Sequence, residues 1–363
     1  MGSDLPRAES RGPILQDVPL APLTTLGIGG AARWFGRAAS APEVVAADEW
    51  AALRGAPMFV LGGGSNLVIA DRGFDGLVLQ MQVSRVQASD GGDNTIVVAG
   101  AGESWDGLVA FAVSRNLAGI ECLSGIPGSV GGTPVQNVGA YGQEVASVIE
   151  WVDAVDRLQQ KAVRLSQAEC RFAYRQSRFK QEDEERFVIC QVAFRLQNGG
   201  QATVAYRDLI EYFGKQHLES PSLQAVRDAV LTIRRGKGMV IDAADPDTRS
   251  VGSFFMNPVI DRAAFERFAP APHYPMDNDA VKVPAAWLIE QSGFARGHTD
   301  GASGLSTKHP LAIVNRGGAT ARDIIRLARR IKTAVFDRFG IALRPEPVFV
   351  GFKDDPDVEY LRG

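Results

Sequence analysis

Three consecutive glycines follow an apolar run in the first third of the chain. Gly62, Gly63 and Gly64 precede Ser65 and Asn66. Without Cβ atoms, several backbone N–H groups can converge on one anion, and the two polar side chains add further donors. An ordinary tight turn is the alternative, although one or two glycines usually suffice for a turn. The spacing therefore favours a cradle for phosphate.

A second glycine-rich stretch, residues 124–142, reads SGIPGSVGGTPVQNVGAYG. It is too apolar for a flexible linker, and its irregular backbone needs partners for its N–H groups. Its glycines can wrap around a rigid ligand, while Ile126 and Val138 can flank a flat apolar ring. Together the two stretches indicate a bulky dinucleotide.

A dinucleotide-binding Rossmann fold is disfavoured. Residues 27–32 fit the pattern G-x-G-x-x-A, but the segment before them carries two prolines where a central parallel strand is required. The acidic residues Glu43 and Asp48 belong to the helix expected after Pro42. No Walker A sequence occurs either.

Three further residues have side chains suited to polar chemistry. Arg175 follows Tyr174 in CRFAYRQSRFK, and it could recognise a carboxylate or phosphate or be a plain surface charge. Ser253 lies in a glycine turn before two phenylalanines; it could donate a proton, act as a nucleophile beside a base, or only shape the turn. Glu346 lies between two prolines that restrict the backbone, which suits either a directed carboxylate or a turn at a strand edge.

The composition excludes several classes of protein. The formal net charge is −3, and no run of Lys or Arg is longer than two, so nucleic acid and anionic membrane surfaces are not expected partners. Three unpatterned cysteines fit a reducing compartment, and no apolar stretch is long enough for a signal or membrane segment. A cytoplasmic protein is therefore expected. No His/Cys cluster has metal-ligand spacing, so no metal is expected.

The elements that must position these residues alternate between helix and strand. Helices are predicted over 41–55, 221–238 and 319–340, and strands within 58–70, 95–119 and 186–196. The last helix is the clearest, because its apolar residues recur every three or four positions, Thr320 can cap its start and Gly340 can end it. The pattern predicts an α+β fold whose chain divides near 200–220.

Five of these motifs occur in the same order in a known family. LGGGSNLV, SGIPGSVGGTPVQNVGAYG, CRFAYRQS, VGSFFMNP and RPEPVF make the chain, from Leu20 to Gly351, resemble UDP-N-acetylenolpyruvoylglucosamine reductases. That family belongs to the flavoproteins of the vanillyl-alcohol-oxidase/PCMH type. The resemblance implies a two-lobed α+β FAD-binding domain and a C-terminal α+β substrate-binding domain.

The resemblance also implies limits for these parts. The FAD-binding domain covers 19–218 with its lobes split near 80, and the polar, Pro/Gly-rich composition of residues 1–18 separately predicts a mobile leader there. The substrate-binding domain covers 219–340, and a C-terminal segment, 341–363, returns to the active site.

The family's functional residues carry over motif by motif. The implied catalytic residues are Arg175, Ser253 and Glu346. The implied FAD contacts are Gly62, Gly63, Gly64, Ser65, Asn66, Ser124, Gly125, Ile126, Pro127, Gly128, Gly131, Gly132, Asn137, Gly139 and Ala140. The implied substrate contacts are Tyr174, Tyr206, Lys237, Asn257, Tyr274, Lys282 and His309. The insertion APHYPMD, which contains Tyr274, places the chain in the type I branch of the family.

The implied chemistry is a flavin-dependent reduction. NADPH would reduce FAD, and hydride would pass from flavin N5 to C3 of UDP-N-acetylglucosamine enolpyruvate, while Ser253 protonates C2. The product, UDP-N-acetylmuramate, serves peptidoglycan synthesis.

Relatives with covalent flavin use a His or Cys near the first glycine turn; Ser65 and Asn66 stand there, so FAD is expected to be non-covalent. A monomer is expected. The alternatives are another flavin oxidoreductase on this scaffold, or a sugar-nucleotide-binding protein without activity.

Overall fold

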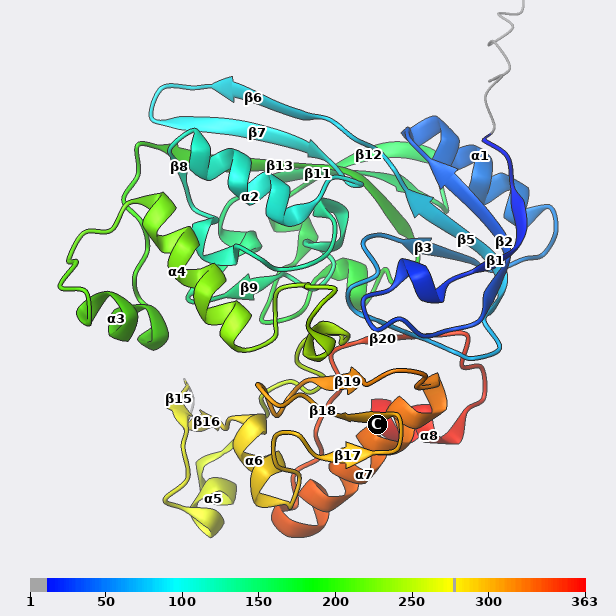
Figure 1. Ribbon diagram of the computed structural model, residues 1–363. Helices are drawn as coiled ribbons and strands as arrows, with labels where there is room; N and C mark the ends of the chain where they lie inside the picture. Colours follow the sequence, from blue (N-terminus) through cyan, green and yellow to red (C-terminus); the bar gives the residue numbers. More distant parts are fainter. Residues whose placement is uncertain (1–11, 277–278) are drawn as a thin grey trace, which may run out of the picture. The chain divides into compact units, whose positions relative to one another are not determined.

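The computed structural model describes residues 12–276 and 279–363, and the chain forms two compact units. Unit 1 comprises the described residues up to Val18, Ala32–Gly63 and Asp75–Arg234. Unit 2 comprises Pro19–Ala31, Gly64–Phe74 and Arg235–Gly363. Each unit mixes helices with small sheets (Figure 1). Every helix in the described ranges is too short or too polar to cross a lipid bilayer.

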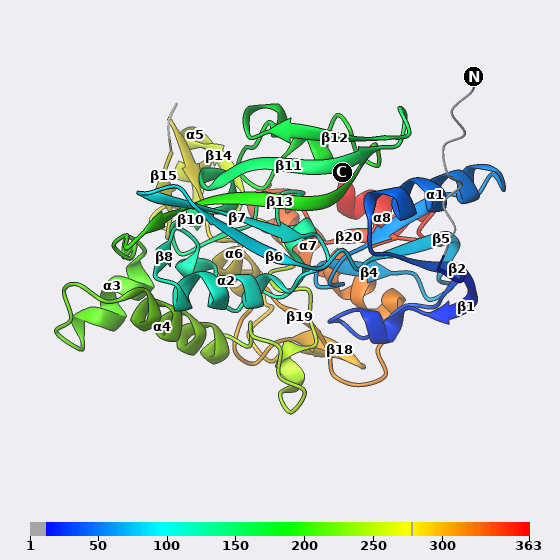
Figure 2. The same cartoon turned by 90° about the horizontal axis from the view of Figure 1, so that it is seen from above.

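Unit 1 is built around two sheets. The smaller has the order β1-β2-β5-β3, with β3 and β5 parallel. The larger has the order β12-β11-β13-β7-β6, is antiparallel along that path, and has β8 paired to β13 (Figure 2). The strands are β1 (Leu15–Pro19), β2 (Ala31–Ala38), β3 (Met58–Leu61), β5 (Phe74–Met81), β6 (Val86–Asp90), β7 (Asn94–Gly100), β8 (Leu117–Ala118), β11 (Ile149–Asp156), β12 (Lys161–Ser166) and β13 (Phe187–Asn198). A short hairpin adds β9 (Gly139–Ala140) and β10 (Gln143–Glu144).

One apolar core holds these sheets and their helices together. The helices of this unit are α1 (Ala41–Ala52), α2 (Trp105–Ser114), α3 (Arg207–Gly214) and α4 (Leu223–Gly236), the last of which ends just beyond the unit. Trp105 and Phe194 are fully buried in the core, with their rings 5.8 Å apart. The indole of Trp105 donates to Leu123 O at 3.0 Å, so its one polar atom is satisfied.

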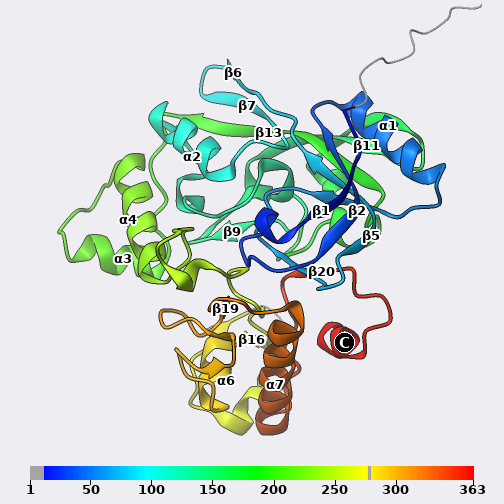
Figure 3. The ribbon, with the colours of Figure 1, turned by 45° about the vertical axis from the view of Figure 1, so that its right-hand side comes forward.

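Unit 2 packs small sheets against one long helix. β4 (Leu67–Ile69) pairs in parallel with β20 (Val348–Val350), although the two strands are far apart in sequence. The remaining strands are β14 (Val259–Asp261), β15 (Tyr274–Pro275), β16 (Ala280–Lys282), β17 (Thr299–Asp300), β18 (Ser303–Leu305) and β19 (Ile313–Asn315). The helices are α5 (Arg262–Phe265), α6 (Ala285–Gln291), α7 (Ala321–Phe339) and α8 (Pro356–Arg362), and Figure 3 shows α7 beside α6.

Helix α7 combines strong local signals with a buried lysine that its sequence pattern does not predict. Thr320 and Asp323 form a reciprocal capping box, and Gly340 ends the helix with a left-handed φ of 69°. Its apolar residues at steps of three and four are buried. Lys332 is also buried, and its ammonium group donates to Tyr360 O at 2.8 Å and Leu361 O at 2.9 Å. Burial lowers the pKa of Lys332.

The predicted elements are confirmed, with small shifts at their ends. The helix predicted over 41–55 runs from Ala41 to Ala52, and Ser40 caps it by accepting from Glu43 N. The helix predicted over 221–238 runs from Leu223 to Gly236. Most of this helix packs within unit 1, so the compact units differ in extent from the predicted domains. The domain limits stay a prediction, because a division by contacts does not by itself define a folding domain.

The C-terminal glycine of α7 provides a test of this local account. A Cβ added to Gly340 or to Gly214 would meet open space, but only Gly340 has positive φ. Gly340→Ala should therefore destabilise the protein by about 1 kcal/mol, because an L side chain resists the left-handed region. Gly214→Ala should be neutral or stabilising by up to about 1 kcal/mol, since alanine favours helix. Urea unfolding of both variants measures this; an equal response would contradict it.

Candidate functional site

Two glycine segments of unit 1 approach each other more closely than side chains would allow. A Cβ on Gly63 would lie 2.6 Å from Gly128 Cα, and a Cβ on Gly62 would lie 2.6 Å from Ser129 Oγ. Real Cβ atoms do not tolerate such distances to backbone, so Gly63 requires glycine, whereas a side chain at Gly62 would displace only the Ser129 hydroxyl. Gly64, which belongs to unit 2, has a φ of 66° and would collide there with the carbonyl oxygen of Leu23. Within the predicted cradle, the packing therefore demands glycine at Gly63 and Gly64.

The 124–142 loop is fastened at its start to helix α2. Gly125 N donates to Asp106 Oδ1 at 2.6 Å, and Arg227 of α4 donates to both oxygens of the same carboxylate, at 2.6 and 2.9 Å. Burial works to raise the pKa of Asp106, but the bonds from Arg227 and Gly125 outweigh it and hold the pKa below its usual value. Asp106 is thus a charged anchor for the loop. Ser124, fully buried, donates to Glu121 O at 2.6 Å.

The next part of the loop contains a buried hydroxyl group with no partner. Among the residues that the structure describes, Ser129 Oγ is buried and forms no hydrogen bond. Buried polar atoms are nearly always paired, so this one calls for an explanation. It lies beside the space that a Cβ on Gly62 would occupy. A polar ligand against Gly62 and Gly63 would give Ser129 its missing partner.

The end of the loop is fixed by Asn137. Its Oδ1 accepts from Ala146 N at 3.1 Å, and its Nδ2 donates to Glu144 Oε2 at 3.1 Å and Ala173 O at 3.0 Å. The amide is therefore engaged within the protein, and its predicted contact with a cofactor stays a prediction. Gly139 and Ala140 form strand β9 and pair with β10. The other predicted cofactor residues of this loop lie between its two fixed ends; they are Ile126, Pro127, Gly131 and Gly132.

Arg175 lies at the tip of a two-residue turn in unit 1. Ala173 and Gln176 close the turn by two reciprocal backbone hydrogen bonds of 3.0 Å, which leaves Tyr174 and Arg175 at the tip. Arg175 has a φ of 56°, which non-glycine residues seldom adopt. Its guanidinium donates to Gly139 O at 2.7 Å and Asn137 O at 3.3 Å. The structure therefore ties Arg175 to the glycine-rich loop, while Tyr174 is half exposed.

Unit 2 brings together Ser253 and Glu346, which are far apart in sequence. Phe255 forms an antiparallel bridge with Pro345, Met256 N donates to Arg344 O at 3.0 Å, and Glu346 N donates to Phe254 O at 2.8 Å. The VGSFFMNP and RPEPVF motifs therefore lie side by side. Asn66 joins them.

Two hydrogen bonds link Asn66 to the RPEPVF motif. Its Nδ2 donates to Glu346 O at 3.2 Å, and its carbonyl oxygen accepts from Val348 N at 2.9 Å. The Asn66 side chain thus supports the backbone that carries Glu346. This structural role is separate from the predicted contact of Asn66 with a cofactor, which stays a prediction.

A histidine lies near the hydroxyl of Ser253. Ser253 Oγ and His309 Nε2 are 3.5 Å apart, at the outer limit of a hydrogen bond. His309 N in turn donates to Ser306 Oγ at 3.2 Å. The spacing of the four histidines along the sequence does not indicate which of them could act with Ser253, and the structure brings His309 close to its hydroxyl. The pair can exchange a proton if the oxygen and nitrogen approach slightly.

The remaining predicted substrate contacts fall into two groups. In unit 2, Tyr274 and Lys282 are partners across β15 and β16, and the Lys282 ammonium lies 5.9 Å from the Tyr274 ring centre. Asn257 Oδ1 accepts from Ala285 N at 2.9 Å, and Lys237 precedes Gly238, which packs near Asp247 and Lys308. In unit 1, Tyr206 packs edge-on against Tyr141, with ring centres 5.4 Å apart. Tyr274 is half exposed.

Sequence reasoning did not identify the residues that hold these segments. Asp106 and Arg227 look like ordinary helix charges, since an acidic residue in a first turn is common. Ser129 belongs to a glycine-rich string and carries no separate signal. No group of three or more His, Cys, Asp and Glu side chains in the described part of the chain could hold a metal ion.

Comparisons with known proteins identify the family of this chain. The family model for the C-terminal domain of UDP-N-acetylenolpyruvoylglucosamine reductase matches residues 245–350, and that for an FAD binding domain matches residues 34–165. The UDP-N-acetylenolpyruvoylglucosamine reductase of Thermobifida fusca is 46% identical over 349 residues, which cover 93% of this chain and 98% of the relative. That of Streptomyces avermitilis is 47% identical over 350 residues, covering 93% and 95%.

A solved structure matches the fold along nearly the whole chain. The crystal structure of UDP-N-acetylenolpyruvylglucosamine reductase from Thermus caldophilus has a TM-score of 0.65 at 25% identity and covers 93% of this chain and 99% of its own. The predicted α+β class, with an FAD-binding domain and a C-terminal domain, is confirmed. The chain therefore belongs to the UDP-N-acetylenolpyruvoylglucosamine reductase family of flavin-dependent oxidoreductases.

Proposed function

We propose that this protein reduces UDP-N-acetylglucosamine enolpyruvate to UDP-N-acetylmuramate with NADPH as electron donor, in peptidoglycan precursor synthesis. The observation that carries the proposal is the pairing of the Ser253 and Glu346 motifs in unit 2, where Phe255 bridges Pro345. Nothing in either motif alone requires this pairing. A reductase of an enol ether needs a proton donor close to groups that stabilise negative charge, and this pairing supplies such a neighbourhood.

The cofactor of this reaction is proposed to be non-covalent FAD. The residues of unit 1 fit a dinucleotide: the backbone of Gly62 and Gly63 packs closely against Gly128 and Ser129, and Ser129 Oγ there is buried without a partner among the described residues. Ser65 and Asn66 carry neither thiol nor imidazole, the groups that would bond to the isoalloxazine ring. When bound, FAD would supply hydride chemistry between the nicotinamide and C3 of the substrate.

Arg175 and Glu346 are proposed to stabilise the charge that develops on C2 and the substrate carboxylate. An arginine binds a carboxylate through two parallel N–H donors, which positions it as well as neutralising it. Arg175 is preorganised for this by its bonds to Gly139 O and Asn137 O. A preorganised donor of this kind is typically worth about 3–4 kcal/mol of transition-state stabilisation. Glu346 is proposed to donate a hydrogen bond as a neutral carboxyl group, because an ionised carboxylate only accepts hydrogen bonds.

Ser253 is proposed to protonate C2. A serine hydroxyl is a weak acid, so it needs a second group to restore its proton after transfer. His309, whose Nε2 lies 3.5 Å from Ser253 Oγ, is placed for that step. This assignment differs from the predicted role of His309 as a substrate contact.

The rest of the substrate would be held by neutral and basic side chains. Lysine ammonium groups suit a diphosphate, and aromatic hydroxyl groups suit a sugar nucleotide. The proposed contacts are Tyr174, Tyr206, Lys237, Asn257, Tyr274 and Lys282. Tyr274 is proposed to close over the bound substrate, since it is exposed on a strand of two residues. We also propose that the enzyme is a cytoplasmic monomer.

The cofactor proposal predicts that Gly63 cannot carry a side chain. Gly63→Ala should weaken FAD binding by about fivefold or more, because overpacking of this kind typically costs about 1–3 kcal/mol. Gly107→Ala is the matched control, since its Cβ would meet Ser104 only at ordinary contact distance, 3.4 Å. Titration of FAD into each apoprotein, followed by flavin fluorescence, measures the effect. Equal affinity in both variants would contradict the cradle.

The proton-donor proposal predicts a selective defect. Ser253→Ala should leave flavin reduction by NADPH nearly intact while slowing flavin reoxidation by the enolpyruvyl nucleotide by about 100-fold or more. Anaerobic stopped-flow absorbance separates the two half-reactions. Ser114→Ala, an exposed serine on α2, serves as control. An equal loss in both half-reactions of Ser253→Ala would rule out the assignment.

A further inference from the structure

The segment that carries Arg175 is a strained excursion between β12 and β13. It contains three non-glycine residues with left-handed backbone: Arg171 (φ 49°), Arg175 (φ 56°) and Glu185 (φ 65°). Each such residue costs free energy of order 1–3 kcal/mol and persists only where its surroundings impose it. Arg171 and Glu185 lie near the two ends of the excursion and Arg175 at its tip. Something must therefore hold the segment in this conformation.

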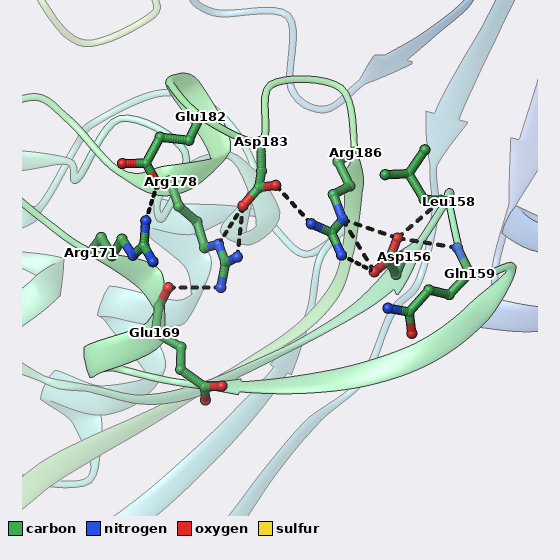
Figure 4. A network of polar contacts seen from close by, with 9 residues as sticks. All are labelled: Asp156, Leu158, Gln159, Glu169, Arg171, Arg178, Glu182, Asp183 and Arg186. Carbon is green, nitrogen blue, oxygen red and sulfur yellow. Dashed lines mark hydrogen bonds and ion pairs between the residues drawn. The ribbon is translucent and has the colours of Figure 1, made fainter.

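A chain of ion pairs crosses the base of the excursion (Figure 4). Asp183 accepts from two arginines: from Arg178 Nε and Nη2 at 2.8 and 2.7 Å, and from Arg186 Nη1 at 3.0 Å. The Asp183 side chain is only 13% exposed, so solvent screens these bonds little. Burial works to raise the pKa of Asp183, but the bonds from both arginines keep it below its usual value.

The chain continues from Arg186 into the large sheet. Arg186 donates to Asp156, the last residue of β11, with Nη2 at 2.8 Å from Oδ2. Asp156 is buried and also accepts from Leu158 N at 3.0 Å and Gln159 N at 3.3 Å. These bonds make Asp156 a fixed end of the network. The excursion is thereby tied to a rigid element of unit 1.

Arg178 connects the two limbs of the excursion and leads to its tip. Its Nη1 donates to Glu169 O on the incoming limb at 3.0 Å, while its other nitrogens reach Asp183 on the outgoing limb. Ser177, directly before it, donates to Val135 O in the glycine-rich loop at 2.5 Å. Arg178 follows Arg175 by three residues, so a shift of its backbone would displace the turn that presents Arg175.

We propose that Asp183 is a positioning residue for Arg175: by pairing with Arg178 and Arg186 it clamps both limbs of the excursion and so holds the Arg175 guanidinium in place. This inference rests on the role proposed for Arg175 in substrate reduction. Asp183 itself does not touch the reacting groups; it acts through the backbone. Arg171, which pairs with Glu182 nearby, adds a more exposed contact to the same base.

The test compares Asp183→Asn with Asp153→Asn in the full-length holoenzyme. Asp153 forms a similar two-bond pair with Arg164, at 2.8 and 2.9 Å, within the β11–β12 ladder and outside the ion-pair chain of Asp183. Asp183→Asn should slow flavin reoxidation by the enolpyruvyl nucleotide by about 100-fold, the size expected for a displacement near 1 Å. Flavin reduction by NADPH should stay unchanged. Asp153→Asn should leave both half-reactions at the wild-type rate.

A double-mutant comparison separates positioning from general destabilisation. In the Arg175→Ala background, Asp183→Asn should cause no further loss of reoxidation rate, because the group it positions is already gone. Arg178→Lys is a second variant, which keeps the test decisive if Asp183→Asn fails to fold. It keeps the positive charge but loses the two parallel bonds to Asp183, and it should slow flavin reoxidation in the same selective way.

The outcomes are distinguishable. Additive losses in the double mutant, or an Asp183→Asn enzyme as fast as Asp153→Asn, would overturn the inference while leaving the reductase proposal intact. A wild-type enzyme whose reduced flavin the enolpyruvyl nucleotide does not reoxidise would refute the reductase proposal, and the positioning role with it. Selective loss in Asp183→Asn and Arg178→Lys without additivity supports the clamp.

Discussion

The close approach of two backbones, at Gly62 and Gly63 on one side and Gly128 and Ser129 on the other, is the constraint on which unit 1 depends. The first pair follows β3 and the second precedes a short turn that is bonded to the end of β7 and the start of α2. A side chain at Gly63 would push the two backbones apart, and one at Gly62 would displace the Ser129 hydroxyl. The close approach places the buried Ser129 hydroxyl, which has no hydrogen-bond partner among the described residues, next to Gly62, and an atom of this kind favours a polar ligand there.

From that point a continuous set of hydrogen bonds reaches the proposed catalytic arginine. Asp106 holds the start of the glycine-rich loop, Asn137 holds its end and also binds Ala173, and Arg175 folds back onto Gly139. The ion pairs of Asp183 then secure the excursion from the other side. The glycine-rich loop and Arg175 are thus parts of one bonded structure. Its charges act locally, through fixed geometry more than through long-range attraction.

Much of the fold could be predicted from local pattern, and the reasons are visible in single elements. Helix α7 has a periodic apolar face, a capping box and a terminal glycine, all of which act within a few residues. The parallel pairing of β4 with β20 and the Phe255–Pro345 bridge could not be predicted, because they join segments far apart in sequence. Lys332 and Asp183 look like surface charges in the sequence, and only tertiary packing buries them. The motifs indicate which residues are candidates for chemistry, but the residues that hold them in place carry no local signal.

The central claim is that a flavin held by this chain reduces an enolpyruvyl sugar nucleotide. It is tested most directly by a single turnover under argon. The purified holoenzyme is reduced with NADPH, separated from the nicotinamide nucleotide, and mixed with the enolpyruvyl substrate. We expect the absorbance of oxidised flavin to return in step with one lactyl ether product per flavin, identified by its mass. A flavin that stays reduced until oxygen is admitted, with the substrate recovered unchanged, would contradict the claim.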